Sequence, residues 1–130
     1  MATTLAIGTD KGLFRVTMTS RGWALGEPEL LGWRVTALAT TGAGTRLAAT
    51  GSGWFGPAVQ RLDGGKWQQA SDIPRLPDHL DRKVEQLWRF HQAPEALYLG
   101  VADAGLFRSE DDGITWTPVD GLNDHESAPA

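Results

Sequence analysis

The chain contains no cysteine, a single tyrosine and no long run of charges of one sign. The absence of cysteine excludes disulfide frameworks, zinc–thiolate sites and cysteine nucleophiles. Its 12 basic and 16 acidic residues are interspersed and give a net charge of −4, so we expect no nucleic-acid partner. Apolar stretches are short, and the first residues lack the basic and apolar regions of a secretory signal. We therefore expect a cytoplasmic chain with no membrane partner.

Glycine and tryptophan are frequent, with 16 and 6 copies among 130 residues, a length that predicts one domain. Trp23, Trp67 and Trp116 each end a similar segment, and their spacing of roughly 40–50 residues is the period of a β-propeller blade. The tetrapeptide Gly-Leu-Phe-Arg recurs at residues 12–15 and 105–108, in register with the first and last of these tryptophans. We therefore interpret the chain as a series of repeated units.

Short segments rich in Val, Leu, Trp, Tyr and Phe alternate with Gly, Pro, Asp or Ser, which is typical of β-strands joined by turns. The expected strands lie near residues 4–9, 12–18 and 23–26, then 34–40, 46–51, 58–63 and 66–71, and finally 84–91, 96–102, 105–109 and 115–119. Residues 81–90 are the one candidate helix, and we interpret them as a strand.

These units predict an all-β fold, a partial β-propeller of about three blades, each a four-stranded antiparallel sheet. The blades would span approximately residues 1–30, 31–72 and 80–120 of a domain covering 1–122, followed by a loose tail at 123–130. We expect the first blade to lack its innermost strand, because the sequence begins just before the strand at 4–9.

Residues 109–116 follow the pattern Ser-x-Asp-x-Gly-x-Thr-Trp, whose fixed residues are Ser109, Asp111, Gly113, Thr115 and Trp116. Such a segment is expected to form a hairpin turn in which Ser and Asp bond nearby backbone groups, Gly supplies a positive φ and Trp buries its ring. We assign these residues a structural role. The acidic run 110–112 suggests calcium as an alternative, but the turn explains Asp111 without an ion. We expect no metal and no cofactor.

This pattern is the Asp-box of BNR-repeat propellers, and the chain resembles the N-terminal part of a bacterial branch of that family, which is described as sialidase-like or glycosyl hydrolase-type. The resemblance is carried by residues 7–14, 31–33, 54–57 and 121–125. It implies a β-propeller fold that continues for several more blades. After His125 the sequence departs from the family's pattern, in which proline follows the Asn-Asp-His segment.

In such a fold, the connections between blades share one rim with the loops that join the second and third strands of each blade. This rim would carry Asp10, the 52–57 loop, the 71–83 connection and Asp103, opposite the Asp-boxes, and the 84–91 strand would line the central channel. The candidate ligand-binding residues are Trp33, Arg34, Trp54, Phe55, Trp88, Arg89, His91, Asn123, Asp124 and His125.

Each candidate also has a structural interpretation. Trp54 and Phe55 would either stack on a sugar ring or cap the core. Arg89 and His91 would either bind an anion or form an ordinary channel-lining pair. Residues 123–125 have metal-binding or acid–base potential, or they simply end the chain.

Three functions are compatible with these residues, and we favour a non-catalytic module that binds a glycan or a protein on its loop face. The second is a sialidase-like glycoside hydrolase, which needs two carboxyl groups or a tyrosine nucleophile with an acid partner. The only tyrosine, Tyr98, lies in an expected strand, and Arg15 recurs as Arg108, which favours a structural role for both arginines. The third is a truncated gene product without independent activity.

Three blades cannot close a ring of the four to eight blades that propellers use. Open faces would therefore remain beside Leu5, Trp23 and Leu25. Such open edges pair readily with another chain. We expect either a homodimer that builds a six-blade ring through these edges or a marginal, aggregation-prone monomer.

Overall fold

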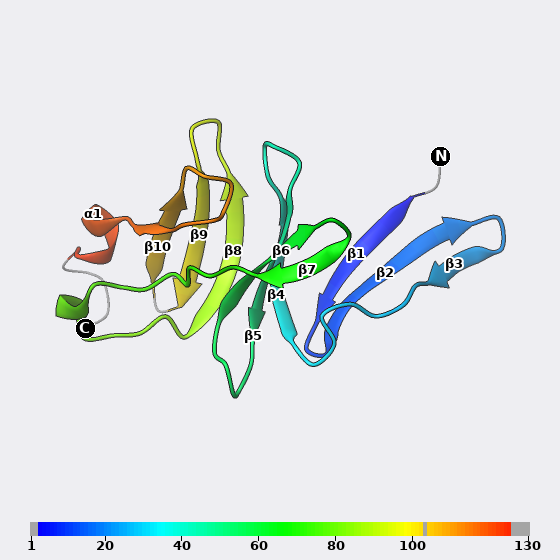
Figure 1. Cartoon of the computed structure of the whole chain (residues 1–130), viewed down its shortest axis with the longest axis horizontal. Helices are drawn as coiled ribbons and strands as arrows, with labels where there is room; N and C mark the ends of the chain where they lie inside the picture. The colour runs from blue at the N-terminus through cyan, green and yellow to red at the C-terminus, as the bar shows by residue number, and fades with distance from the viewer. Residues whose placement is uncertain (1–2, 103, 126–130) are drawn as a thin grey trace.

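The computed structural model describes residues 3–102 and 104–125, and its fold is all-β, with three separate antiparallel sheets. The sheets follow one another along the chain, and the second lies between the first and the third (Figure 1). Each sheet is built from consecutive strands joined by turns, as the alternation of apolar segments with Gly, Asp and Pro predicts.

The first sheet has the order β1-β2-β3, with strands Thr4–Thr9, Gly12–Thr19 and Gly22–Leu25. The second has the order β4-β5-β6-β7, with strands Arg34–Thr40, Arg46–Gly51, Ala58–Asp63 and Lys66–Gln69. The third has the order β8-β9-β10-β11, with strands Gln86–Gln92, Leu97–Ala102, Gly105–Ser109 and Thr117–Pro118. A 3-10 helix, η1 (Asp78–Leu80), precedes the third sheet, and a helical turn, α1 (Asp120–Asn123), follows it.

Every strand expected from the sequence is present, and the first sheet has three strands where the others have four. Residues 81–90 contain no α-helix: 81–85 form a loop, and 86–90 belong to strand β8, in line with the strand that we expected there. The expected tail at 123–130 begins inside α1, and its residues 126–130 lie outside the described part of the chain.

The first and third sheets pair their central strands in the same register. The matching pairs are Ile7–Phe14 with Leu99–Phe107, Gly8–Leu13 with Gly100–Leu106, and Ala6–Arg15 with Tyr98–Arg108. Opposite residues in an antiparallel pair carry their side chains on the same face of the sheet. The repeat in the sequence is therefore also a repeat in strand pairing and in the faces that the side chains occupy.

The larger apolar core lies between the second and third sheets. The second sheet contributes Leu47, Ala49 and Val59, and the third contributes a larger set: Leu87, Phe90, Leu97, Leu99, Val101, Phe107 and Trp116. The Trp116 side chain is buried, and its ring centroid lies 6.1 Å from that of Phe90. Burial of these apolar side chains is the main force that holds the two sheets together.

A polar contact joins the first and second sheets. Arg15 Nε donates to Glu29 Oε2 over 2.6 Å, and Trp67 Nε1 donates to Glu29 Oε1 over 2.9 Å. Burial raises the pKa of Glu29, but the hydrogen bonds from Arg15 and Trp67 outweigh burial, so this pKa lies below its ordinary value.

A Cβ atom at Gly8 would lie 2.8 Å from Val35 Cγ1, so the close approach of β1 to β4 requires glycine.

A second set of polar contacts joins the second sheet to the Asp-box. Arg61 Nη1 donates to the backbone oxygen of Asp112, and Thr45 Oγ1 donates to the Asp112 carboxylate. Gly113 has a φ of +83°, and a Cβ atom there would lie 2.9 Å from Leu47 Cδ1. The Asp-box turn is thus held directly against the neighbouring sheet, and glycine is needed both for its φ and for its contact.

Asp111 organises this turn internally. Its Oδ1 accepts hydrogen bonds from Ser109 Oγ and from the Thr115 backbone, both at 2.8 Å, and Ser109 Oγ accepts from the Gly113 backbone at 2.9 Å. Burial raises the pKa of Asp111, but the hydrogen bonds from Thr115 and Ser109 outweigh it and hold this pKa below its ordinary value of 3.8. These contacts match the structural role expected for the box.

We predict that Trp116→Ala destabilises the protein far more than Trp54→Ala. Trp116 is 7% exposed and Trp54 is 93% exposed. Truncating a buried tryptophan costs about 3–5 kcal/mol, whereas truncation at an exposed loop position costs about 0.5 kcal/mol or less. Urea denaturation of the two variants measures the difference, and equal midpoints would contradict the packing described here.

We also predict that the stabilising effect of Asp111 depends on pH. Because folding lowers the pKa of this carboxyl group, its contribution is complete above the ordinary value of 3.8 and is lost as pH falls through the lower folded pKa. Asp111→Asn should therefore lower the free energy of unfolding by about 1 kcal/mol at neutral pH, with a smaller difference in acid. Denaturation at both pH values tests this, and a pH-independent difference would count against it.

Candidate functional site

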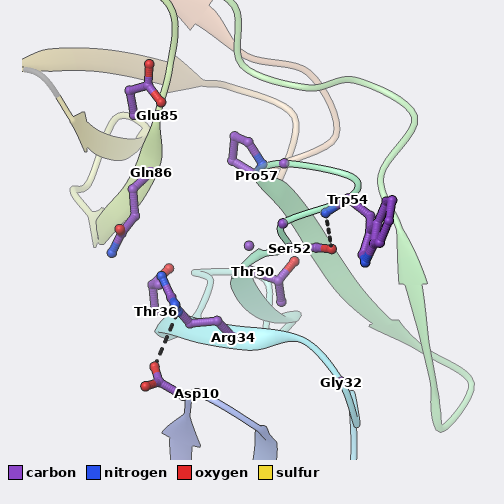
Figure 2. A pocket seen from close by; sticks show the side chains of 13 residues that line it. Asp10, Gly32, Arg34, Thr36, Thr50, Ser52, Trp54, Pro57, Glu85 and Gln86 are labelled. Atoms are coloured by element: carbon purple, nitrogen blue, oxygen red, sulfur yellow. Dashed lines mark hydrogen bonds and ion pairs between the residues drawn. The ribbon is translucent and has the colours of Figure 1, made fainter.

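A polar cavity of about 420 Å³ opens at one end of the sheets, where several chain segments converge. Its lining comes from the β1–β2 turn, the start of β4, the β5–β6 loop and the approach to β8 (Figure 2). The principal side chains are those of Asp10, Arg34, Thr36, Ser52, Trp54 and Glu85. Asp10 and the 52–57 loop, which the sequence assigned to one rim, line this cavity, whereas the 71–83 connection does not and Asp103 lies outside the described residues.

The β5–β6 loop holds Trp54 at the rim of the cavity. Two backbone hydrogen bonds between Ser52 and Gly56 close the loop, and Ser52 Oγ accepts from the backbone nitrogens of Trp54 and Phe55 over 3.1 and 3.3 Å. Gly56 has a φ of +71°, which glycine adopts without strain. The side chain of Trp54 is 93% exposed. An ordered loop therefore presents a large aromatic surface to solvent.

Charged and amide groups line the rest of the cavity. Arg34 Nε lies 3.3 Å from Asp10 Oδ1, and both side chains are largely exposed. Glu85 and Gln86 lie across the cavity from Trp54 (Figure 2). Exposed ion pairs contribute little to folding stability, so the guanidinium and the carboxylate can exchange partners for a ligand at small cost. The cavity thus combines hydrogen-bond donors and acceptors with one exposed aromatic ring.

Trp33 and Phe55 pack against each other beside the cavity and do not line it. Their ring centroids are 6.1 Å apart, and the rings are tilted by 36°. This contact ties the segment before β4 to the β5–β6 loop. The Phe55 side chain is 75% exposed, so it joins the two segments at the surface and does not cap the core.

The strand β8 contributes to the cavity at its approach and not along its length. Glu85 and Gln86 line the cavity, whereas Trp88, Arg89 and His91 do not. An irregularity in the pairing between Leu87 and Arg89 leaves both Trp88 and Arg89 exposed. Arg89 and His91 lie opposite Gly100 and Tyr98 in the β8–β9 pairing, and the channel that we expected them to line stays a prediction.

The three residues at 123–125 do not form a site together. Asn123 is buried, and its side chain accepts from the Leu106 backbone nitrogen over 2.8 Å and donates to the Leu106 oxygen over 3.0 Å. Its amide is therefore occupied in anchoring α1 to β10, in place of the ligand contact we expected. Asp124 Oδ1 lies 3.2 Å from His79 Nε2, and His125 donates its backbone N–H to Leu122.

The Asp-box lies at the opposite end of the sheets from the cavity. Asp112 contacts Thr45 in the β4–β5 turn, whereas the cavity lies at the other ends of these strands, beside Arg34 and Thr50.

Within residues 3–102 and 104–125, no three His, Cys, Asp or Glu side chains are grouped so that they could hold a metal ion. In the same part of the chain, every helix is too short or too polar to cross a membrane.

The expected set of site residues omitted several that line the cavity: Asp10, Thr36, Thr50, Ser52, Glu85 and Gln86. Asp10 and Ser52 lie in turns that the sequence assigned to this rim, so position alone could have included them. Thr36 could not be found in this way, because it lies at an irregularity in the β4–β5 pairing, between Val35 and Ala37. Such bulges redirect a side chain without any clear signal in the residue pattern.

We predict that Asn123→Ala destabilises the protein by about 1–3 kcal/mol, because it leaves the backbone N–H of Leu106 without its partner, whereas the Leu106 oxygen still accepts from Val119 N. The neighbouring Asp124→Ala is the matched control. Asp124 is exposed and makes one surface contact, so this change should cost about 0.5 kcal/mol or less. Thermal unfolding compares the two, and equal losses would contradict the anchoring role of Asn123.

The arrangement can bind a polar ligand through its carboxylates, guanidinium and amide, with an aromatic ring for an apolar face. Tyr98, the only tyrosine, does not line the cavity, and its hydroxyl donates to Glu95 over 3.2 Å.

No protein-family model and no curated protein sequence matches this chain. The function is therefore inferred from the geometry of the cavity.

Proposed function

We propose that the chain is a BNR-type propeller module that binds a carbohydrate, without catalysis, in the cavity beside Trp54. The single observation that carries this proposal is the fully presented Trp54 ring at the rim of a polar cavity. The repeated strand register and the hydrogen bonds of the Asp-box support the propeller assignment. So does the contact of β4 with β8, because these are the first strands of neighbouring four-stranded sheets.

Carbohydrate chemistry fits the groups that the cavity offers. A sugar ring has an apolar C–H face and an equator of hydroxyl groups. The exposed indole of Trp54 suits the apolar face, because a tryptophan ring provides a large rigid contact surface. The hydroxyl groups both donate and accept hydrogen bonds, which suits Asp10, Arg34 and Glu85. A protein ligand remains the second candidate for this loop face.

Glycoside hydrolysis is the alternative that one observation favours, since two carboxylates, Asp10 and Glu85, line the same cavity. A hydrolase uses such a pair on either side of the scissile bond. Its general acid normally lies in an apolar enclosure that keeps it protonated. Both carboxylates here are exposed, with the Asp10 side chain at 83%, and Asp10 is paired with Arg34. Binding therefore fits the cavity better than hydrolysis.

A glycan array followed by calorimetry on a selected glycan tests the proposal. We predict that Trp54→Ala weakens binding about tenfold or more, the loss typical of a central aromatic contact. Trp88→Ala is the matched control, because Trp88 is also exposed but lies outside the cavity, and it should leave the affinity unchanged.

Binding that survives Trp54→Ala, or that is lost equally in Trp88→Ala, would contradict the assignment of the site. The same preparations should be incubated with chromogenic glycosides. Release of the chromophore that disappears in Glu85→Gln would establish the hydrolase alternative in place of simple binding.

A further inference from the structure

The first sheet leaves one of its faces open to solvent. The pairing of β1, β2 and β3 places seven apolar side chains on this face: Leu5, Ile7, Phe14, Val16, Met18, Trp23 and Leu25. Trp23 is 52% exposed and Leu25 is 69% exposed. We call these seven residues the first-sheet face. An apolar surface of this kind on a soluble domain marks an interaction site.

The first-sheet face corresponds to the face of the third sheet that packs against the second. Through the shared register, residues of the first-sheet face correspond to buried residues of the third sheet: Leu5 to Leu97, Ile7 to Leu99, and Phe14 to Phe107. Trp23 follows Arg15 by the same interval as Trp116 follows Arg108. Leu97, Leu99, Phe107 and Trp116 are all buried in the core between the second and third sheets. The first-sheet face therefore has the character of a surface that another sheet covers.

The third sheet has a free face of the matching kind. The pairing of β8, β9 and β10 places five larger side chains on it: Arg89, His91, Tyr98, Leu106 and Arg108. We call these five the third-sheet face. By register, Leu106 and Arg108 correspond to Leu13 and Arg15, which face the second sheet and line the space beside Trp67. The third-sheet face is thus equivalent to a surface that packs against the next sheet along the chain.

An arginine lies at the same register position in each sheet: Arg15 on β2, Arg61 on β6 and Arg108 on β10. Arg15 bonds Glu29 beside Trp67, and Arg61 bonds the backbone oxygen of Asp112. Arg108 occupies the same position on the third sheet, where it contacts Glu110 and lies over the Tyr98 ring. A sheet packed on the third-sheet face would meet Arg108 in the same way.

The open edge of β1 and the third-sheet face match in size and charge. Thr3 O accepts from Met18 N, so the backbone groups of Thr4, Ala6 and Gly8 point to the open edge of β1. On the second sheet, the positions facing β8 are the small residues Ala37 and Ala39. On the third sheet, the corresponding positions are the long cationic or titratable side chains of Arg89 and His91. Arg89 and His91 would occupy the space of the fourth strand that the first sheet lacks. They would donate hydrogen bonds to the carbonyl oxygens on the open edge of β1.

We propose that the first-sheet face of one copy of this chain packs on the third-sheet face of a second copy. The two copies would then be related by a two-fold axis and make this contact twice, which closes six sheets into one ring. The contact is head-to-tail, and a two-fold axis closes it without forming a fibre. The free faces of a single copy lie on sheets at opposite ends of the molecule, so one copy cannot satisfy both (Figure 1).

Light scattering coupled to size exclusion tests the assembly. We expect a particle of twice the 14.0 kDa chain mass at about 100 µM, a concentration at which a weak but specific contact is populated. Trp23→Asp should convert the particle to a monomer, because it places a charge in the centre of the contact. Trp54→Asp is the matched control on an exposed loop and should leave the dimer intact. A wild-type mass of 14.0 kDa at that concentration would overturn the proposal.

A cysteine pair tests which faces meet, and the absence of native cysteine makes the result specific. By register, Leu5 corresponds to Leu97 and Tyr98 corresponds to Leu47, and the side chains of Leu47 and Leu97 both lie within 3.5 Å of the Cβ position of Gly113. The double variant Leu5→Cys with Tyr98→Cys should therefore form a covalent dimer on mild oxidation, and neither single variant should. No cross-link in the double variant, or equal cross-linking of a single variant, would overturn the head-to-tail arrangement.

Discussion

The structure depends on the packing of each sheet against the next. A sheet of three or four short strands cannot bury an apolar face alone, so every sheet here needs a neighbour. The second sheet has neighbours on both sides, and it holds more apolar residues of 0% exposure, such as Leu47, Ala48 and Val59, than either of the other sheets. The first sheet has one neighbour, and its strand β3 is exposed throughout. Polar contacts from Arg15 and Arg61 fix how adjacent sheets are placed.

The same packing positions the cavity. Strands β4 and β8 start at this end and β1 ends there, so the start of β4, the approach to β8 and the β1–β2 turn meet at the cavity. The β5–β6 loop then adds Trp54 on a turn closed by its own hydrogen bonds. The Asp-box holds the opposite end. Stability and the candidate site are thus separated along the strands, and changes at one end need not disturb the other.

Much of the fold could be predicted from the sequence, because strands, turns and the Asp-box depend on local patterns. Ser109 and Asp111 bond the turn as the pattern indicates, and Trp116 is buried. The site was less predictable. The exposure of Trp88 and the inward position of Thr36 both arise at pairing irregularities, which have no simple sequence signal. Asn123 was expected at a ligand site, but its partner is the backbone of Leu106, a contact set by tertiary structure.

The central claim is that neighbouring sheets, and not the strands of one sheet, determine local stability. Hydrogen exchange of backbone amides measured at low and high protein concentration tests it most directly. The account predicts that amides in the β1–β2 ladder exchange faster than those in the β5–β6 ladder in dilute solution. Their protection should then rise with concentration as the first sheet gains a neighbour. Equal protection of all three sheets, unchanged by concentration, would contradict the account.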